Sequence, residues 1–73
     1  MVEKYLKTCF DRKNFNYEIK NGDFVFDCGR NPFEFARVIS FIYKKLEDWT
    51  YDLELQLKIE ILTGYEKVVV GIA

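Results

Sequence analysis

The sequence predicts a single α+β domain over residues 1–73, a two-layer sandwich with the element order αββαββ. In this fold a four-stranded antiparallel sheet carries both helices on one face. Apolar and polar residues alternate throughout residues 51–61, which is typical of a strand with one apolar and one solvated face. Asn21-Gly22, between two shorter alternating runs, indicates a tight hairpin. Asn31-Pro32, followed by apolar residues at helical spacing, indicates a long helix between these segments.

Length and composition limit what this domain can be. Hydrophobic residues make up 49% of the 73 residues, which argues against intrinsic disorder, and so short a chain builds one core of marginal stability. A protein partner, a second copy in a homodimer or a disulfide would add stability. No apolar run is long enough to cross a bilayer, and Glu3, Lys4 and Lys7 leave no signal-peptide core. We therefore expect a cytoplasmic protein without a membrane partner.

The residue types that bind metals are scarce in this sequence. It contains no histidine and two cysteines, Cys9 and Cys28. A closed zinc site would need carboxylates or a second subunit, so we expect no metal and no cofactor. In a reducing cytosol the two thiols are interpreted as small buried hydrophobic groups, and a disulfide between them is the alternative.

A first helix is predicted at residues 2–11. Its apolar residues follow the i, i+3, i+4, i+7, i+8 spacing of one helical stripe, namely Val2, Tyr5, Leu6, Cys9 and Phe10. A helix this short depends on tertiary packing. The alternative interpretation of this segment is an additional edge strand.

The first hairpin is predicted at residues 15–28. Both central residues of a type I′ turn need positive φ, which Asn21-Gly22 accepts, and a two-residue loop then fixes the register of the strands. The predicted opposite pairs are Lys20 with Asp23, Ile19 with Phe24, Tyr17 with Phe26 and Phe15 with Cys28.

The second helix has the clearest start in the sequence. Asn31 is its predicted N-cap, Pro32 occupies the first helical position and Glu34 the third. A broad apolar stripe should lie on the sheet, formed by Phe35, Val38, Ile39, Ile42, Tyr43, Leu46 and Trp49. Phe33 and Phe41 fall outside this stripe, and Phe41 lies among charged residues.

The last two strands are predicted to form a hairpin that begins with residues 51–61. Keeping apolar residues together pairs Ile59 with Val68, Leu57 with Val70 and Leu55 with Ile72, and sets Glu60 opposite Lys67. In that register residues 51–54 overhang their partner. The overhanging edge would seek another strand, either within the domain or from a second subunit.

Charge is predicted to divide between the two layers despite a net charge of −1. The outer face of the sheet would carry six carboxylates against three lysines: Glu18, Asp23, Asp27, Asp52, Glu54 and Glu60 against Lys20, Lys58 and Lys67. The helices and their links would carry an excess of positive charge. Such a dipolar surface can steer partners of opposite sign, although solubility alone also requires surface charge.

These features favour a non-enzymatic protein–protein interaction module, a small regulator or inhibitor. Small acidic inhibitors encoded by mobile elements offer an analogy in size and charge, without a motif match. We expect binding through the acidic sheet face or through a helix patch around Phe41, because exposed aromatic residues are favoured interface anchors. The candidate binding residues are Phe33, Arg37, Phe41, Lys44, Glu54 and Glu60.

Two other classes of function remain open at this point. Weak nucleic-acid binding is the alternative, with Arg37, Lys44 and Lys45 around Phe41 touching phosphates; the slightly acidic composition and the absence of an RNA or DNA signature argue against it. Catalysis is the weakest class. Asp52 and Glu54 would share an open strand face that shifts neither pKa far, so we expect no enzymatic activity.

Overall fold

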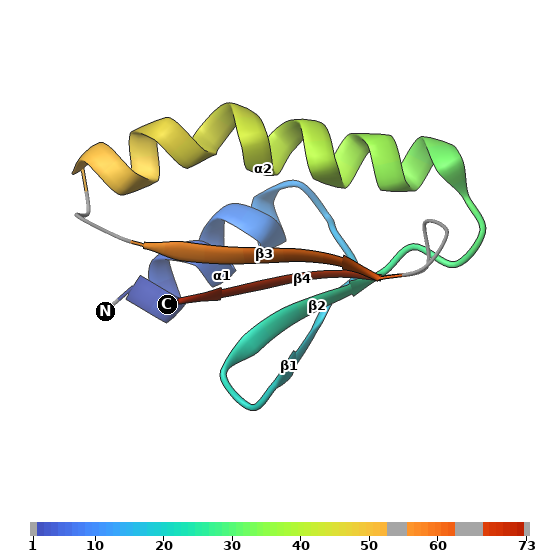
Figure 1. Cartoon of the computed structure of the whole chain (residues 1–73), viewed down its shortest axis with the longest axis horizontal. Coiled ribbons are helices and arrows are strands. Elements are labelled where there is room, and N and C mark those ends of the chain that lie inside the picture. The colour runs from blue at the N-terminus through green and yellow to red at the C-terminus, as the bar shows by residue number, and fades with distance from the viewer. Residues whose placement is uncertain (1, 53–55, 63–66, 73) are drawn as a thin grey trace.

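Two α-helices lie on one face of a four-stranded antiparallel sheet in the computed structural model, which describes residues 2–52, 56–62 and 67–72 (Figure 1). In chain order the elements are α1 (Val2–Arg12), β1 (Glu18–Lys20), β2 (Asp23–Asp27), α2 (Pro32–Asp52), β3 (Leu57–Leu62) and β4 (Lys67–Ile72). The strand order is β1-β2-β4-β3, so β2 and β4 are central while β1 and β3 form the edges. The predicted α+β fold and its αββαββ order are confirmed.

The segment predicted as the first helix is helical, and the alternative of an edge strand is wrong. Its C-terminal end forms a Schellman motif, in which Asn14 adopts φ 58°. The N–H of Phe15 donates to the carbonyl of Phe10 at 3.3 Å, and the N–H of Asn14 donates to the carbonyl of Asp11 at 3.0 Å. Asparagine accepts this left-handed conformation more readily than most residues. The motif turns the chain toward β1 and brings the rings of Phe10 and Phe15 to 6.4 Å.

The first hairpin has the predicted turn and register. Asn21 and Gly22 both have positive φ, at 52° and 83°, and Ile19 lies opposite Phe24. β1 begins only at Glu18, so the predicted pairs Tyr17 with Phe26 and Phe15 with Cys28 lie outside the ladder. The residues that precede β1 in the chain still contribute side chains to the core, since the ring centroids of Tyr17 and Phe26 are 5.9 Å apart.

α2 begins as predicted. The side-chain oxygen of Asn31 accepts the backbone N–H groups of Phe33 and Glu34 at 3.0 and 3.1 Å, which satisfies two donors that a helix start leaves without partners. The Glu34 carboxylate does not complete a capping box; it pairs with Arg37 instead, one turn further along the helix.

The end of α2 corrects the prediction that a strand begins at residue 51. Tyr51 and Asp52 are the last residues of the helix, and β3 starts only at Leu57. The register explains the difference, because Leu57 pairs with Ile72, the last residue of β4. A longer β3 would extend beyond its partner and leave backbone groups unpaired, whereas a helix satisfies them internally.

The register of the β3–β4 hairpin also differs from the prediction, by two residues. Ile59 lies opposite Val70 rather than Val68, and Glu60 lies opposite Val69 rather than Lys67. A shift of two keeps every side chain on its predicted face, so the alternation of apolar and polar residues cannot distinguish the two registers. Of the remaining predicted pair, Leu55 lies outside the described residues, and Ile72 is paired with Leu57.

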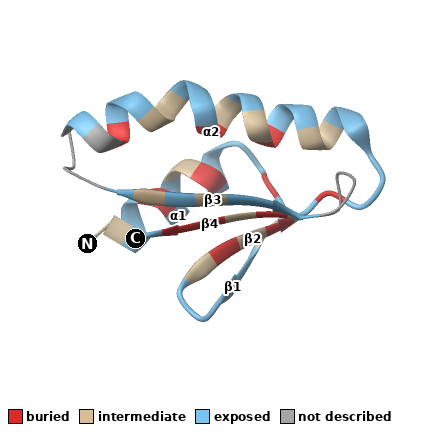
Figure 2. Cartoon of the chain, viewed as in Figure 1, coloured by how far each residue is buried: buried red, intermediate tan, exposed pale blue. Residues whose placement is uncertain are grey.

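The core lies between the helices and one face of the sheet, where the buried residues gather on α1, α2 and the two central strands, β2 and β4 (Figure 2). Phe10 of α1 is at its centre. The ring of Phe10 meets those of Phe24 and Phe26 on β2 at 5.1 and 4.8 Å, and that of Trp49 on α2 at 5.9 Å. Edge-to-face aromatic packing of this kind holds α1 and α2 against the same sheet face.

Candidate functional site

A basic hollow lies on the helix layer, beside the link between α1 and β1. It has a volume of about 340 Å³ and is lined by Lys13, Arg37, Ser40, Phe41, Lys44 and Lys45. The last five residues come from one side of α2. Ser40, Phe41, Lys44 and Lys45 follow Arg37 by three, four, seven and eight residues, so the helical period brings them together. None of these lining residues is acidic. We call this feature the basic hollow.

Lys13 enters the basic hollow because of how α1 ends. The guanidinium Nη1 of Arg37 donates to the Lys13 carbonyl at 3.0 Å, which ties the link to α2. The ammonium group of Lys13 lies 5.4 Å from the centre of the Phe41 ring, within the range of a cation–π contact. Sequence reasoning missed Lys13 and Ser40, since nothing local in the sequence shows that the link after α1 meets this side of α2.

Phe41 is not the free aromatic anchor that the sequence predicted. Its side chain is half-buried, and its ring centroid lies 5.4 Å from that of Phe15, 6.1 Å from that of Trp49 and 6.3 Å from that of Phe10. The helical wheel places Phe41 outside the stripe that faces the sheet. It is covered nonetheless, because α1 packs against that flank of α2.

Arg37 is engaged by neighbours within its own layer. Its guanidinium bonds both carboxylate oxygens of Glu34, with N–O distances of 3.2 and 3.3 Å, and lies 4.5 Å from the centre of the Phe15 ring. Much of its hydrogen-bonding capacity is therefore used. For Lys44 and Lys45, no ion pair joins either ammonium group to another described residue. The lysines thus supply most of the charge that a ligand could use.

The other predicted binding residues do not join the basic hollow. Phe33 is 85% exposed in the first turn of α2 and is not among the lining residues. Glu60 is exposed on β3, at the opposite face of the sheet. Glu54 lies outside the described residues. The structure therefore brings together Arg37, Phe41 and Lys44, and it separates Phe33 and Glu60 from them.

A second hollow, on the exposed side of α1, has the same sign of charge. It has a volume of about 420 Å³ and is lined by Lys4, Tyr5, Thr8, Cys9 and Arg12. Among the described residues, two cations and no carboxylate line it. The excess of positive charge predicted for the helix layer is therefore concentrated at its hollows.

The outer face of the sheet is less acidic than predicted. Asp52 belongs to α2 and Glu54 is outside the described residues, which leaves four carboxylates against three lysines on the described strands. Two of the carboxylates are paired: Glu18 with Lys20 at 3.4 Å and Asp23 with Lys58 at 3.6 Å. Over the described strands, the predicted acidic face is thus nearly balanced in charge.

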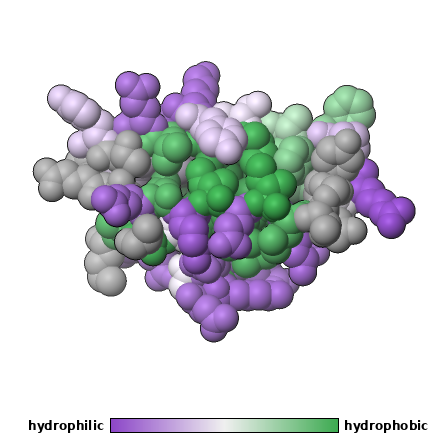
Figure 3. All heavy atoms as spheres, viewed as in Figure 1, coloured by the Kyte–Doolittle hydropathy of each residue, from purple (hydrophilic) through white to green (hydrophobic). Residues whose placement is uncertain are grey.

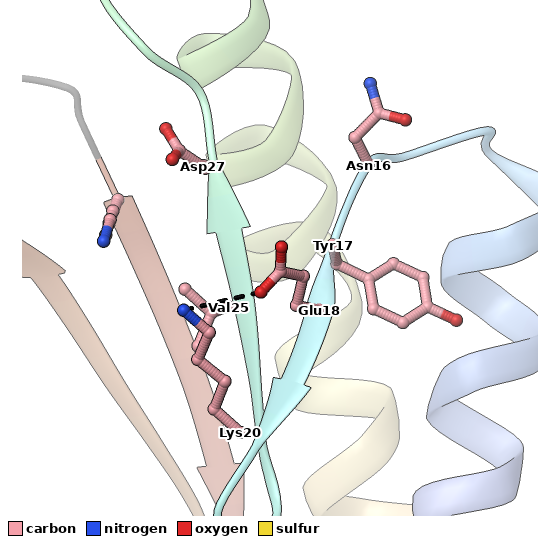
Figure 4. Close-up of a pocket in the computed structure, with 7 residues that line it drawn as sticks. Asn16, Tyr17, Glu18, Lys20, Val25 and Asp27 are labelled. Atoms are coloured by element: carbon pink, nitrogen blue, oxygen red, sulfur yellow. Dashed lines mark ion pairs between the residues drawn. The ribbon is translucent and has the colours of Figure 1, made fainter.

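The outer sheet face holds a mixed hollow of about 200 Å³ beside β1 and β2. It is lined by Asn16, Tyr17, Glu18, Lys20, Val25, Asp27 and Lys67. In Figure 4 the Glu18–Lys20 ion pair lies over Val25, while the ring of Tyr17 turns toward the helices. Carboxylates and ammonium groups both line this hollow, so it does not favour a ligand of either charge.

A hydrogen-bonded triad joins α1 to the start of β1. The Tyr17 hydroxyl donates to the Asp11 carboxylate at 2.6 Å, and the Lys7 ammonium bonds the other oxygen at 3.1 Å. The Tyr17 hydrogen bond is the main reason that the pKa of Asp11 is lowered, with Lys7 adding to the effect. The triad is solvated and has a structural explanation, since it fixes the chain after the Schellman motif.

The two cysteine thiols are both free. Cys9 is half-buried, and Cys28 is buried just after β2. Burial, with smaller contributions from the nearby Glu34 and Asp27 carboxylates, raises the pKa of Cys28 above its usual value. A raised pKa leaves less thiolate at neutral pH, which makes a weak nucleophile.

Comparison with family models, with curated proteins and with solved structures found no match to this chain. Within the described ranges, neither helix combines the length and hydropathy needed to cross a membrane, and no group of three or more His, Cys, Asp or Glu side chains could hold a metal ion. The function must therefore be inferred from the surfaces of this chain itself, and the basic hollow is the most distinctive of them.

Proposed function

We propose that this protein is a non-enzymatic binding module whose basic hollow takes an acidic segment of another protein. The observation that most strongly supports this is the group of four cationic side chains, from α2 and the link after α1, around one hollow that no carboxylate of the described residues lines. Charges of one sign around a concave surface attract and orient a ligand of the opposite sign. In this role the chain is a small regulator or inhibitor that occupies a surface of its partner.

A helix-layer site fits this proposal better than the outer sheet face does. The sheet face carries nearly equal numbers of positive and negative side chains, and its hollow is lined by both. A surface of mixed charge discriminates weakly between acidic and basic partners. The basic hollow is one-sided in charge, so it selects for carboxylates.

An acidic protein segment suits the hollow better than a nucleic acid. Single-stranded nucleic acids bind to aromatic rings whose faces are open for base stacking. The Phe41 ring instead packs among three other rings, with the Lys13 ammonium 5.4 Å from its centre. The Arg37 guanidinium already pairs with the Glu34 carboxylate. Lysine ammonium groups remain, and these act as point charges that pair readily with single carboxylates.

The test is fluorescence anisotropy with a labelled oligoglutamate peptide, an oligoglutamine peptide of the same length, and a labelled oligothymidylate. We expect the oligoglutamate to bind at low ionic strength and the oligoglutamine not to bind. The double variant Lys44→Glu/Lys45→Glu should weaken oligoglutamate binding by about tenfold or more, because it replaces two attractive charges by two repulsive ones.

A matched control carries the same change in net charge on the other layer. The variant Lys20→Glu/Lys67→Glu alters the outer sheet face, so it should leave oligoglutamate binding within about twofold of the wild type. Equal weakening by both double variants would show that net charge alone governs binding, which contradicts the proposal. Tighter binding to oligothymidylate than to oligoglutamate would instead assign the hollow to nucleic acid.

A further inference from the structure

β3 is an edge strand whose apolar side is incompletely covered. β4 pairs with one side of β3, and no described strand pairs with the other. Ile61 points to the core face yet is 49% exposed, and Leu57 and Ile59 are half-buried. Figure 3 shows hydrophobic side chains gathered in the middle of this side of the molecule, between α2 and β3. An open edge of six residues is a template for another strand.

α2 extends the apolar surface beside β3. Phe41 marks the flank of α2 that faces α1, because its ring meets that of Phe10. Ile39 and Tyr43 lie on the opposite flank of the helical wheel, the flank directed away from α1 and toward β3. Ile39 is half-buried and Tyr43 is 53% exposed. The uncovered surface therefore combines a strand edge with a helix flank.

We propose that a second copy of this chain covers this surface, with the two β3 strands paired antiparallel about a two-fold axis at Ile59. In this register Lys58 of each copy lies opposite Glu60 of the other, and Leu57 lies opposite Ile61. Opposite charges and apolar side chains facing one another both stabilise antiparallel pairs. The strand is thus complementary to itself, as a two-fold interface requires.

The charges on β3 select this register over its neighbours. Opposite residues must lie on the same face of the sheet, so only registers that differ by an even number of residues keep the apolar side chains together. Moving the two-fold axis from Ile59 to Glu60 sets the Glu60 side chains of the two copies opposite each other. Moving it to Lys58 does the same for the two Lys58 side chains. Like charges directly opposite one another destabilise the pairing.

The spacing of the two layers is compatible with this arrangement. Each helix covers about two strands, and two strands span roughly 10 Å, which is close to the distance of 8 to 10 Å at which helices pack. The α2 helices of the two copies would therefore meet along their Ile39 and Tyr43 flanks while the β3 strands pair. The result is one continuous sheet of twice the width, with all four helices on one face.

The other edge of the sheet does not offer an equal alternative. β1 has only three residues, against the six of β3. Short edges discourage strand addition. Pairing β1 with β3 of another copy around Ile19 and Ile59 would set Lys20 opposite Lys58 and Glu18 opposite Glu60. These like charges disfavour the open, head-to-tail assembly of copies.

The test is sedimentation equilibrium over a wide concentration range, on the wild type and on charge variants of β3. We expect a reversible wild-type dimer and no larger species. In the dimer, residue 58 of each copy faces residue 60 of the other, which gives two such pairs. Lys58→Glu alone or Glu60→Lys alone places like charges in both pairs, so each should raise the dimer dissociation constant by about tenfold or more. The double variant Lys58→Glu/Glu60→Lys restores opposite charges and should recover the dimer.

Mixing the two single variants tests most directly whether residue 58 of one copy faces residue 60 of the other. One variant then carries two glutamates on β3 and the other two lysines, so they should form a mixed dimer although each dimerises poorly alone. Glu18→Lys, which makes the same charge change on the β1 edge, should leave dimerisation unchanged. Because Lys58 also pairs with Asp23 at 3.6 Å, thermal unfolding followed by circular dichroism checks that each variant is folded.

A monomeric wild type at every concentration overturns the proposal. So does a dimer that the single variants leave intact, or a mixture of the two single variants that stays monomeric while each is folded. These outcomes are independent of peptide binding at the basic hollow, which lies on the other flank of α2.

Discussion

At the scale of single residues, the core depends on aromatic side chains contributed by separate elements. Phe10 and Trp49 are both almost completely buried, and their rings are 5.9 Å apart. The indole N–H of Trp49 has no hydrogen-bond partner among the described residues. A buried donor left unpaired costs roughly 1 to 3 kcal/mol, so the tryptophan stabilises the fold through its size and in spite of its polar atom.

Substitution of Trp49 separates the effect of this nitrogen from that of the ring. Trp49→Phe removes the unpaired donor together with part of the ring. Removing the cost of that donor partly offsets the lost packing, so we expect the free energy of unfolding to fall by less than about 1.5 kcal/mol. Trp49→Ala leaves a cavity and should cost about 3 to 5 kcal/mol. Chemical unfolding measures both. A loss for Trp49→Phe well above about 1.5 kcal/mol would mean that the indole N–H makes a hydrogen bond in solution.

The hydrogen bonds that Asp11 accepts from Tyr17 and Lys7 make the stability of the fold depend on pH. The pKa of this carboxyl is lowered from its usual 3.8, first by the Tyr17 hydrogen bond and then by Lys7. A carboxyl whose pKa is lower in the folded chain than in the unfolded chain stabilises the fold above pH 3.8, and this contribution disappears as the pH falls through the lowered pKa.

Tyr17→Phe should therefore raise the pKa of Asp11 toward 3.8, and Lys7→Ala should raise it less, in an NMR titration of the carboxyl carbon. Asp11→Asn should be less stable than the wild type at pH 7, and this difference should shrink as the solution becomes more acidic than the usual pKa. An Asp11 titration that Tyr17→Phe leaves unchanged would show that the hydrogen bond does not persist in solution.

Several residue-scale features could be predicted because they depend on neighbours in the sequence. The Asn31 cap and the Asn21-Gly22 turn are decided by local hydrogen bonds and by φ. Lys13 and Phe41 are different. Their meeting depends on the direction in which the chain leaves α1, and a helical wheel gives the angle of Phe41 without showing that another helix lies on that side.

At the scale of elements, the sequence predicted which face each strand side chain takes, but not the β3–β4 register or where α2 ends. Both corrections have one cause. Alternation has a period of two, so a shift of two residues leaves the core face unchanged. Because Leu57 pairs with Ile72, the last residue of β4, a strand that began at residue 51 would extend beyond its partner, and α2 instead continues to Asp52.

The observed register makes a prediction about Gly71 on β4. Gly71 lies between Asp23 on β2 and Lys58 on β3, and its missing side chain leaves the space in which their ion pair forms. A Cβ at this position would collide with the Asp23 carboxylate. We therefore expect Gly71→Ala to cost about 1 kcal/mol in the wild type, since it displaces that carboxylate.

The same substitution should behave differently once the carboxylate is removed. In an Asp23→Ala background, Gly71→Ala should be neutral or stabilising, because alanine in a strand loses less backbone entropy than glycine on folding. A double-mutant cycle by chemical unfolding measures this coupling. Additive effects of the two substitutions would contradict the observed β2–β4–β3 alignment.

At the scale of the whole molecule, α2 separates two surfaces of different character. The flank beside α1 carries the basic hollow, and the flank toward β3 is apolar and lies next to an open strand edge. The division of charge between the layers was predicted in outline, but the acidic sheet face was overestimated, because it included Asp52, which belongs to α2. Charge counts from sequence are only as accurate as the element boundaries.

The two proposals are compatible in one assembly. A dimer formed through β3 would hold two basic hollows in fixed orientation on the same face of one sheet. A partner with two acidic segments could then bind both, and such bivalent binding can exceed the affinity of one site by a factor of roughly 100 or more. Loss of the dimer would weaken that bivalent binding while leaving each single site intact.

The most direct test of the proposed function is an NMR titration of the ¹⁵N-labelled protein with the oligoglutamate peptide. We expect the largest amide shifts around the basic hollow, at Lys13, Ser40, Phe41, Lys44 and Lys45. Shifts that instead gather on the outer sheet face around Val25 and Val69, or the absence of any shift at low ionic strength, would contradict the proposed function.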